Sequence, residues 1–359
     1  MTYLSPIDDS LFMRAARRLP VERTPVWFMR QAGRVLPEYR AVREKLSLIE
    51  ITRRPDLCAE VTLQPVRRFG VDAAILFSDI MHPLIGAGVD LDIVEGVGPV
   101  IKSPIRRAAD VAALRPLEPL SDLPYVFETI GLLRRELGDN TPLLGFAGAP
   151  FTLASYLIEG KSSRDFARTK ALMYSDSIVW ASLMEHLTEM VITHLRAQLA
   201  AGADAIQLFD SWVGCLSPRE YVTYVQPYTR RIFTELADLG APLLHFGVNT
   251  ATLLEHMRDD GGTVIGVDWR LPLDEAWARL GNRVGIQGNL GPAILFAPPA
   301  IVRREVNDVL DRAAGRHGHI FNLGHGLLPG TPLDGVYAAV DAVRAYSQRE
   351  SVAVEAVTA

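Results

Sequence analysis

Residues 25–40 read PVWFMRQAGRVLPEYR, and the chain changes character within this stretch. Residues 26–28 form an apolar run without alternation, which is typical of a strand buried on both faces. Arg30 and Arg34 follow, so two guanidinium groups stand at the end of a buried strand. Such arginines pair either with a nearby carboxylate, for example Glu38, or with an anionic ligand. The rest of the chain decides between these interpretations.

Seven further apolar runs have the character of buried strands, and helical patterns separate them. Strand and helix in alternation imply a parallel sheet, and eight units predict an α/β fold of the (β/α)8 TIM barrel type. A doubly wound open sheet is the rival. The predicted strands are 26–28, 73–77, 143–146, 205–209, 243–246, 264–269, 283–287 and 319–323. The predicted helices are 11–18, 55–69, 125–137, 163–200, 218–239, 250–258, 273–280, 301–314 and 333–347.

One segment interrupts the alternation. Residues 83–104 are rich in glycine and proline and contain two short apolar runs, 91–94 and 99–101. This pattern predicts a hairpin-like excursion after the second strand. With that insertion, residues 1–359 are expected to form one barrel domain with its core at about 11–346 and a frayed tail at 348–359.

Composition excludes several classes of protein. The 359 residues are 48% hydrophobic and 22% charged, as in an ordinary globular protein, and the net charge of −5 argues against a nucleic-acid binder. No apolar run is long enough for a membrane span, and the amino terminus lacks the pattern of a signal peptide. Cys58 and Cys215 form no disulfide framework. We therefore expect a soluble protein of the cytoplasm.

The barrel assignment gathers polar residues at one place, because active sites in this fold lie at the carboxyl ends of the strands. The first three strands are followed by Arg30, Gln31 and Arg34, by Asp79, and by a segment carrying Tyr156. The later strands contribute Asp210, Ser211, His245, Asn289 and His325. These residues are far apart in sequence and would converge on one mouth.

Each candidate also has a structural interpretation. Asp79 and Ser211 could cap the segments that follow them, and no GxSxG motif surrounds Ser211. Tyr156 could be a core residue, and His245 is more often structural than a ligand. His325 stands between two glycines, which would let the backbone approach a bound molecule.

Cofactor and metal sites are disfavoured. The sequence contains neither a GxGxxG nor a Walker motif. A zinc site needs closely spaced soft ligands, and His245 has no Cys or second His nearby. We expect no cofactor and no metal.

Five motifs together resemble the uroporphyrinogen decarboxylase family: FMRQAGRVLPEYR, ILFSDI, GAPFTLASYLIEG, QLFDSWVG and FNLGHGLLPGTP. The resemblance extends from residue 11 to about 346. It implies a (β/α)8 barrel enzyme of porphyrin and haem biosynthesis without cofactor or metal, usually a homodimer. Such an enzyme removes CO2 from the four acetate side chains of the tetrapyrrole uroporphyrinogen III and yields coproporphyrinogen III.

The resemblance also assigns roles to residues. It implies that the motif Arg30, Gln31, Ala32, Gly33 and Arg34 binds substrate carboxylates, with Arg43 at the rim and Phe209 as further substrate-binding candidates. It implies that Asp79 receives the pyrrole N–H groups, and that Tyr156, Ser211 and His325 complete the site. The residues assigned to catalysis are Asp79, Arg30, Arg34, Tyr156 and His325.

The chemistry agrees with these roles. Eight substrate carboxylates require concentrated cations, and arginine offers a rigid bidentate fork. Loss of CO2 needs an electron sink, which a protonated pyrrole ring provides, and an ionised Asp79 would stabilise that cation. Arginine is a poor acid, so water, a substrate carboxylic acid, Tyr156 and His325 all stay open as the proton donor.

Two other functions stay open. Cobalamin-linked methyltransferases share this barrel but hold zinc with a His-x-Cys pair and a later Cys. Here the corresponding place reads His245-Phe246-Gly247, and no cysteine follows Cys215. The second alternative is a tetrapyrrole binder without catalysis, against which the presence of Asp79 with both arginines argues.

Overall fold

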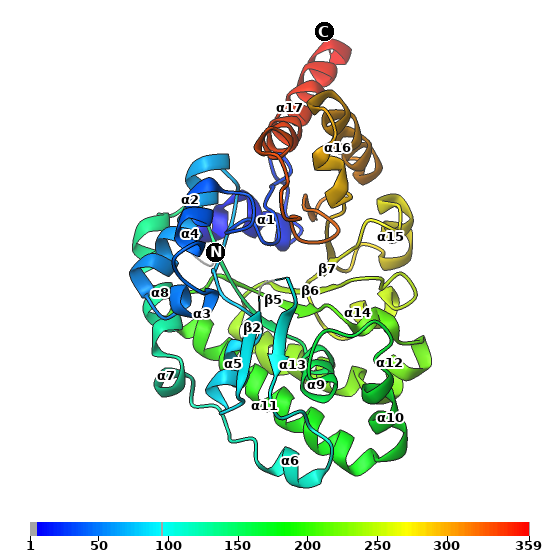
Figure 1. Ribbon diagram of the computed structural model, residues 1–359. Helices are drawn as coiled ribbons and strands as arrows, with labels where there is room; N and C mark the ends of the chain where they lie inside the picture. The colour runs from blue at the N-terminus through cyan, green and yellow to red at the C-terminus, as the bar shows by residue number, and fades with distance from the viewer. Residues whose placement is uncertain (1–5, 95, 359) are drawn as a thin grey trace.

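The structure is a computed structural model that describes the backbone of residues 6–94 and 96–358 and the side chains of 7–94 and 96–346. Its centre is a parallel sheet in the order β1-β4-β5-β6-β7-β8-β9, with helices packed around it (Figure 1). Neighbours in the sheet are neighbours in sequence, apart from one insertion. The strands are β1 (Ala74–Ile75), β4 (Leu143–Gly148), β5 (Ala205–Asp210), β6 (Leu243–Gly247), β7 (Val264–Gly266), β8 (Gly285–Gln287) and β9 (His319–Ile320).

The helices occupy the connections between these strands. Those before β5 are α1 (Leu11–Ala16), α2 (Pro37–Arg43), α3 (Leu48–Thr52), α4 (Pro55–Phe69), α5 (His82–Gly86), α6 (Ala108–Ala112), α7 (Pro119–Asp122), α8 (Pro124–Leu137), α9 (Pro150–Glu159), α10 (Ala167–Ser175) and α11 (Ser177–Ala201). Those after β5 are α12 (Pro218–Tyr224), α13 (Gln226–Leu236), α14 (Leu254–Asp259), α15 (Leu273–Leu280), α16 (Pro299–Ala313) and α17 (Leu333–Thr358). Short 3-10 helices are η1 (Pro6–Asp9), η2 (Val213–Cys215), η3 (Ala237–Leu239) and η4 (Pro292–Phe296).

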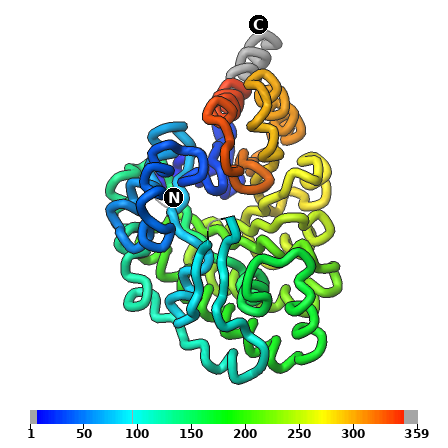
Figure 2. Tube along the Cα trace, in the orientation of Figure 1, coloured from blue at the N-terminus to red at the C-terminus, as the bar shows by residue number. Residues whose placement is uncertain are grey.

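Both edges of the sheet bond to the segment that follows α1. The Phe321 N–H donates to Pro25 O at 2.9 Å, and the Trp27 N–H donates to Phe321 O at 3.3 Å. On the other side, the Asp72 N–H donates to Val26 O at 2.8 Å. The amino-terminal and carboxyl-terminal parts of the chain therefore lie side by side (Figure 2).

The predicted first strand is buried as expected, since the side chains of residues 26–28 are 0% exposed. It is not a regular strand, however, because its ladder consists of the single bridge between Val26 and Phe321. Its tryptophan instead reaches across the sheet interior. Trp27 Nε1 donates to Gln287 Oε1 at 3.0 Å, and Gln287 Nε2 donates to Gln207 Oε1 at 3.0 Å.

Most predicted elements are confirmed, and the hairpin-like excursion is among them. β2 (Leu91–Val94) and β3 (Gly98–Ile101) lie between β1 and β4 in the sequence and form a separate antiparallel pair, with Leu91 opposite Ile101. The predicted strands 73–77, 264–269, 283–287 and 319–323 are shorter in the structure. The prediction missed α9, although Pro150 at its start and the left-handed Gly160 (φ 87°) at its end are usual helix limits.

The carboxyl-terminal helix also differs from the prediction. α17 extends to Thr358, whereas the prediction ended the helix at Ser347. The expected fraying of residues 348–359 stays a prediction. Over the described residues, no helix combines the length and apolar character that a membrane span requires.

The side chain of Gln31 connects the segment 26–28 to the sheet. Its Oε1 accepts from the Phe28 N–H at 2.9 Å, its Nε2 donates to Ala73 O at 2.9 Å, and the residue is 0% exposed. Both backbone groups are buried, so the amide replaces the ladder hydrogen bonds that they lack here.

Gln31→Met should therefore destabilise the protein with little change in side-chain volume. The substitution leaves one N–H and one C=O buried without partners, and we expect a loss of roughly 2–5 kcal/mol in the free energy of unfolding. Urea unfolding followed by circular dichroism measures the loss. Arg304→Gln, which removes an exposed ion pair with Glu305, is the control. Equal unfolding midpoints for the two variants would show that the hydrogen bonds of the Gln31 side chain do not stabilise the fold.

Candidate active site

Five of the predicted site residues lie at the carboxyl ends of the strands. Arg30 and Arg34 follow the segment 26–28, and Asp79 follows β1. Tyr156 lies in α9, directly after β4, and His325 follows β9. Their charges act on one another: desolvation lowers the pKa of Arg30, whereas the nearby Asp79 and Tyr156 raise it. The structure thus brings residues together that are far apart in sequence.

The two arginines make no ion pair with a carboxylate of the described residues. Among the described residues, neither guanidinium makes an ion pair or a hydrogen bond, and Glu38 pairs instead with Arg68 at 3.2 Å. Desolvation, together with the charge of Arg30, lowers the pKa of Arg34 to about 10. The surface-pair interpretation with Glu38 is therefore wrong. Two adjacent desolvated cations, of which only Arg30 has a carboxylate nearby and neither is in an ion pair among the described residues, form a site prepared for an anion.

Arg30 is held by an unusual backbone and by a close glycine. Its φ is 63°, a left-handed conformation that is uncommon for a residue other than glycine. A Cβ on Gly326 would lie 2.5 Å from Arg30 Cδ, so only glycine leaves room for the arginine side chain. A Cβ on Gly324 would likewise lie 2.2 Å from Trp269 N. The sequence suggests that these glycines let the backbone approach a ligand. In the structure they instead leave room for the Arg30 side chain and the Trp269 backbone.

One oxygen of the Asp79 carboxylate is bonded and the other is available. Its Oδ1 accepts from the Met81 N–H at 2.9 Å, within the turn before α5, whereas the N-cap residue of α5 is Met81. Oδ2 has no hydrogen-bond partner among the described residues. Burial raises the pKa of Asp79, against the opposing effects of His82 and Arg30. The hydrogen bond to Met81 fixes the carboxylate while one oxygen stays available.

His82, which the sequence analysis missed, supports the backbone of Asp79. His82 Nδ1 lies 3.0 Å from both the backbone nitrogen and the carbonyl oxygen of Asp79, and His82 Nε2 lies 2.8 Å from Thr52 Oγ1. Thr52 in turn donates to Ile49 O at 3.0 Å. Burial lowers the pKa of His82 and keeps the ring neutral. Its position three residues after Asp79 was the only signal in the sequence.

Tyr156 is 8% exposed and packs edge-on against Trp212, with ring centroids 5.8 Å apart. The Trp212 N–H bonds Thr152 Oγ1 at 3.3 Å, and Thr152 donates to Asp210 Oδ1 at 2.9 Å. Burial raises the pKa of Tyr156, and the charge of Asp79 raises it further. The phenol is therefore protonated near neutral pH.

His325 is half-buried beside the two arginines. Its Nδ1 lies 3.3 Å from Gly326 O, and its ring stands edge-on to Trp269 with centroids 6.3 Å apart. Burial and the charges of Arg30 and Arg34 lower the pKa of His325. The imidazole is therefore neutral at pH 7.

Two of the expected polar side chains lie away from this site. Asp210 and His245 are 0% exposed, and His245 Nε2 lies 3.8 Å from Asp210 Oδ2. His245 Nδ1 lies 3.8 Å from Asp260 Oδ2, on the side of Phe233. Successive side chains of a strand point to opposite faces, so Asp210 points away from the face that carries Phe209.

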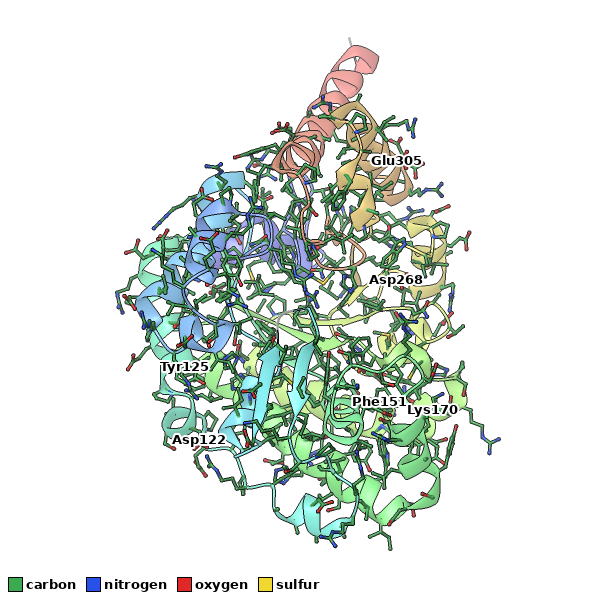
Figure 3. All side chains as sticks on the ribbon, viewed as in Figure 1. Asp122, Tyr125, Phe151, Lys170, Asp268 and Glu305 are labelled. Atoms are coloured by element: carbon green, nitrogen blue, oxygen red, sulfur yellow. The ribbon has the colours of Figure 1, made fainter. Side chains whose placement is uncertain are left out.

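Asn289 and Gln31 are also structural. Asn289 Nδ2 donates to the backbone oxygens of Asp268, labelled in Figure 3, and of Leu271. Both ends of the Gln31 amide are bonded within the core, and the expected role of Gln31 in binding the substrate stays a prediction.

The contacts of the remaining candidates with a substrate stay predictions. Ser211 is partly exposed after β5, and the Phe209 ring lies edge-on to Phe146 at 5.4 Å. Ala32 and Gly33 belong to the turn that carries the arginines, where Gly33 has φ 116°. Arg43 Nη1 donates to Leu46 O at 2.7 Å at the end of α2.

Metal ligands are not assembled in the described part of the chain. There, no group of three His, Cys, Asp or Glu side chains is arranged to hold an ion. Cys58 Sγ donates to Phe77 O, and burial raises the pKa of its thiol to about 12. A zinc–thiolate site of the methyltransferase type therefore has no basis in the described residues.

Comparison with known proteins gives a consistent result. The family model described as "Uroporphyrinogen decarboxylase (URO-D)" matches residues 8–346. A uroporphyrinogen decarboxylase of Thermobifida fusca is 57% identical over 325 residues, which cover 90% of each chain. One from Thermus thermophilus is 54% identical over 336 residues, covering 94% of this chain and 98% of its own.

A solved structure has a similar fold. A methyltransferase from Methanosarcina mazei has a TM-score of 0.80 at 20% identity and covers 94% of this chain and 99% of its own. Identity that low establishes the fold alone. The match of the family model and the identity to the curated relatives establish more: the chain belongs to the uroporphyrinogen decarboxylase family.

Proposed function

We propose that this protein is a carboxy-lyase of porphyrin biosynthesis that converts uroporphyrinogen III to coproporphyrinogen III by removing CO2 from its four acetate side chains. The relatives at 54–57% identity carry the name of this activity. The observation that carries the proposal is the adjacent pair Arg30 and Arg34, which makes no ion pair among the described residues, with the carboxylate of Asp79 close to Arg30.

The arginines bind the substrate. Its carboxylate side chains are the anions that the two guanidinium groups lack within the protein, and each guanidinium can hold a carboxylate with two parallel hydrogen bonds. A bound carboxylate would offset the desolvation that lowers the pKa of Arg34. Binding and charge compensation therefore occur together.

Asp79 acts on the reacting ring. A proton adds to the pyrrole carbon next to the one that bears the acetate arm, and the ring becomes a cation whose positive charge extends to the carbon bearing the arm. The bond between the methylene and the carboxylate carbon then breaks, CO2 leaves, and the bonding electrons neutralise the ring. A second proton enters at the exocyclic carbon and the ring proton is released, so one proton is consumed for each CO2. The free Oδ2 of Asp79 accepts from the pyrrole N–H groups and stabilises the cation where it forms.

The neighbours of Asp79 keep the site low in competing charge. Tyr156 and His325 are both neutral near pH 7, for the reasons given above. The proton donor is water, a substrate carboxylic acid, Tyr156 or His325, and no cofactor is required for the electron sink.

We propose further that the sheet and the segment 25–28 together form a closed (β/α)8 barrel in a single domain. The hydrogen bonds from both sheet edges to Pro25, Val26 and Trp27 support closure. A homodimer in the cytoplasm is proposed from the family resemblance. Light scattering on the purified protein tests the dimer.

The alternative functions have weaker support. The methyltransferase likeness is one of fold, at 20% identity, whereas the decarboxylases reach 57%. A binder without catalysis would not need a carboxylate fixed beside the two arginines. Anaerobic incubation with uroporphyrinogen III, followed by chromatography of the products, separates the three functions, because only the decarboxylase yields coproporphyrinogen III.

Asp79→Asn should abolish most turnover while the protein stays folded. The amide keeps an oxygen that can accept from Met81 but loses the negative charge, and we expect kcat to fall by about 10²–10³-fold. Product formation under anaerobic conditions is the measurement, and an unchanged circular dichroism spectrum is the control. Full activity would contradict the role in cation stabilisation.

The pH dependence of kcat should show the raised pKa of Asp79. The carboxylate must be ionised to act, so activity is present above its pKa and is lost as the pH falls through it. Because burial raises that pKa, the acid limb should lie above the ordinary Asp value of about 3.9. Rates at fixed ionic strength, checked against an unchanged urea midpoint over the same pH range, measure the limb. A limb at or below the ordinary value would contradict an essential buried Asp79.

Gly326→Ala should weaken the enzyme through Arg30. The added Cβ would lie 2.5 Å from Arg30 Cδ and displace the guanidinium, so we expect kcat/KM to fall by about 10–100-fold. Gly131→Ala is the matched control, since a Cβ there meets nothing closer than 4.0 Å and lies within α8. Equal kcat/KM values for the two variants would show that the position of Arg30 does not matter.

A further inference from the structure

A third arginine, Arg270, lies near the site and has no part in the roles given above. It follows β7, whose carboxyl end faces the same side as the ends of β1 and β9, because the sheet is parallel. Asp268 and Trp269 precede it, in the sequence DWR. The three side chains form one unit, which we call the DWR brace.

The brace holds the guanidinium of Arg270 in one place. Its Cζ lies 3.9 Å from the centroid of the Trp269 ring, and its Nη1 lies 3.0 Å from Asp268 Oδ2. The Arg270 N–H also donates to Asp268 Oδ1 at 2.8 Å. Asp268 itself is 3% exposed and accepts from the Asn249 N–H. A side chain fixed in this way has less conformational entropy to lose when it binds a ligand.

The brace is connected to the site through His325. The Trp269 ring meets the His325 ring edge-on at 6.3 Å, and the Trp269 backbone fits against Gly324. The charges on Arg30, Arg34 and Arg270 all act on His325 and lower its pKa. Arg270 therefore belongs to the same electrostatic environment as the carboxylate-binding arginines.

The alternative is an ordinary surface ion pair, which contributes little to stability. Two features oppose it. A guanidinium has five N–H donors, and its bond to Asp268 uses Nη1 only. In addition, the Arg270 side chain is 45% exposed, whereas that of Asp268 is 3% exposed. The Asp268 carboxylate is buried and bonded to Arg270, while the Arg270 guanidinium still has N–H donors available for a ligand.

We propose that Arg270 is a third carboxylate-binding arginine of this active site and that it receives one carboxylate side chain of the tetrapyrrole at the rim formed by the segment after β7. This inference rests on the proposed function. A ring with carboxylates on its whole circumference cannot present all of them to Arg30 and Arg34, which lie on one turn of the chain. A fixed cation on a different strand contacts a different arm of the ring. In a protein with a net charge of −5, it also adds local attraction for a polyanion.

The test is steady-state kinetics of Arg270→Gln with uroporphyrinogen III under anaerobic conditions. We expect KM to rise about tenfold, equivalent to about 1.4 kcal/mol, while kcat stays within about twofold of wild type. Arg270→Lys keeps the charge without the fork and should give an intermediate KM. Trp269→Leu leaves the charge but frees the guanidinium, and its KM should also rise.

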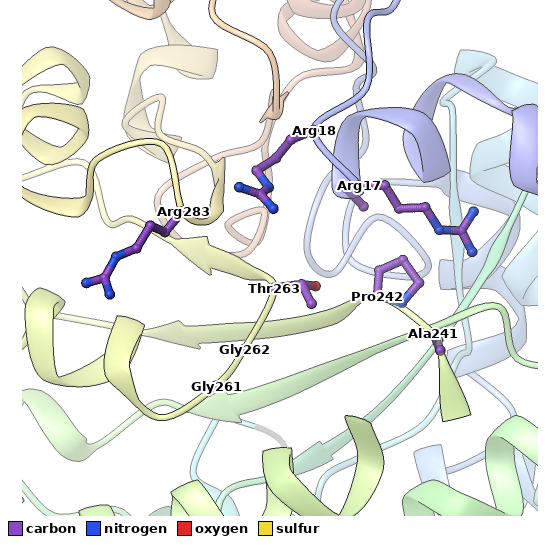
Figure 4. Close-up of a pocket in the computed structure, with 10 residues that line it drawn as sticks. Arg17, Arg18, Ala241, Pro242, Gly261, Gly262, Thr263 and Arg283 are labelled. Carbon is purple, nitrogen blue, oxygen red and sulfur yellow. The ribbon is translucent and has the colours of Figure 1, made fainter. Parts of the chain in front are cut away.

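Arg283→Gln is the matched control. Arg283 is another exposed arginine with one ion pair, to Asp259 at 3.3 Å, but it lines a pocket of about 400 Å³ at the amino ends of β6, β7 and β8 (Figure 4). Its KM should equal that of wild type. A KM for Arg270→Gln within twofold of this control would overturn the inference while leaving the proposed function intact. Absence of turnover by the wild-type protein would instead overturn the proposed function.

Discussion

The hydrogen bonds between the segment 25–28 and both edges of the sheet are the constraint on which the rest of the structure depends. They join the two edges of the sheet through the backbone groups of Pro25, Val26 and Trp27. The segment makes too few ladder bonds to be a regular strand, and the buried amide of Gln31 supplies the missing ones. Because Arg30 and Arg34 follow at once, their position is determined by these hydrogen bonds and not by a surface loop.

The charges of Arg30 and Arg34 at that position indicate a binding site for an anion. Placing two cations side by side in a desolvated environment is costly, and among the described residues neither guanidinium makes an ion pair, although the charge of Asp79 acts on Arg30. A fold retains such an arrangement when a ligand supplies the charge. Asp79 has the opposite problem, since burial raises its pKa and only one of its oxygens is bonded. A substrate with carboxylates on its rim and N–H groups at its centre satisfies both.

Much of this could be predicted from the sequence for an identifiable reason. Buried parallel strands are continuous apolar runs, so their number and order could be read directly, and the barrel geometry then placed Asp79, Tyr156 and His325 at one mouth. Asp210, His245 and Asn289 were misplaced by the same reasoning. Position at a strand end does not tell which face a side chain takes, and a shift of one residue reverses it. His82 was missed because a histidine that bonds to a backbone N–H has no sequence motif of its own.

What the sequence determined by itself is therefore the alternation of elements, the family and the residue types needed for the chemistry, because these depend on local pattern and on whole motifs. The tertiary structure decided which of those residues have partners. Gln31 stands within the most diagnostic motif, and its side chain connects the segment 26–28 to the sheet. Arg270 stands in none of the five motifs, and its side chain is partly exposed. The glycines on either side of His325 serve Arg30 and the Trp269 backbone. The reason is that hydrogen bonds, burial and charge compensation join residues far apart in the chain, and only the folded backbone brings them together.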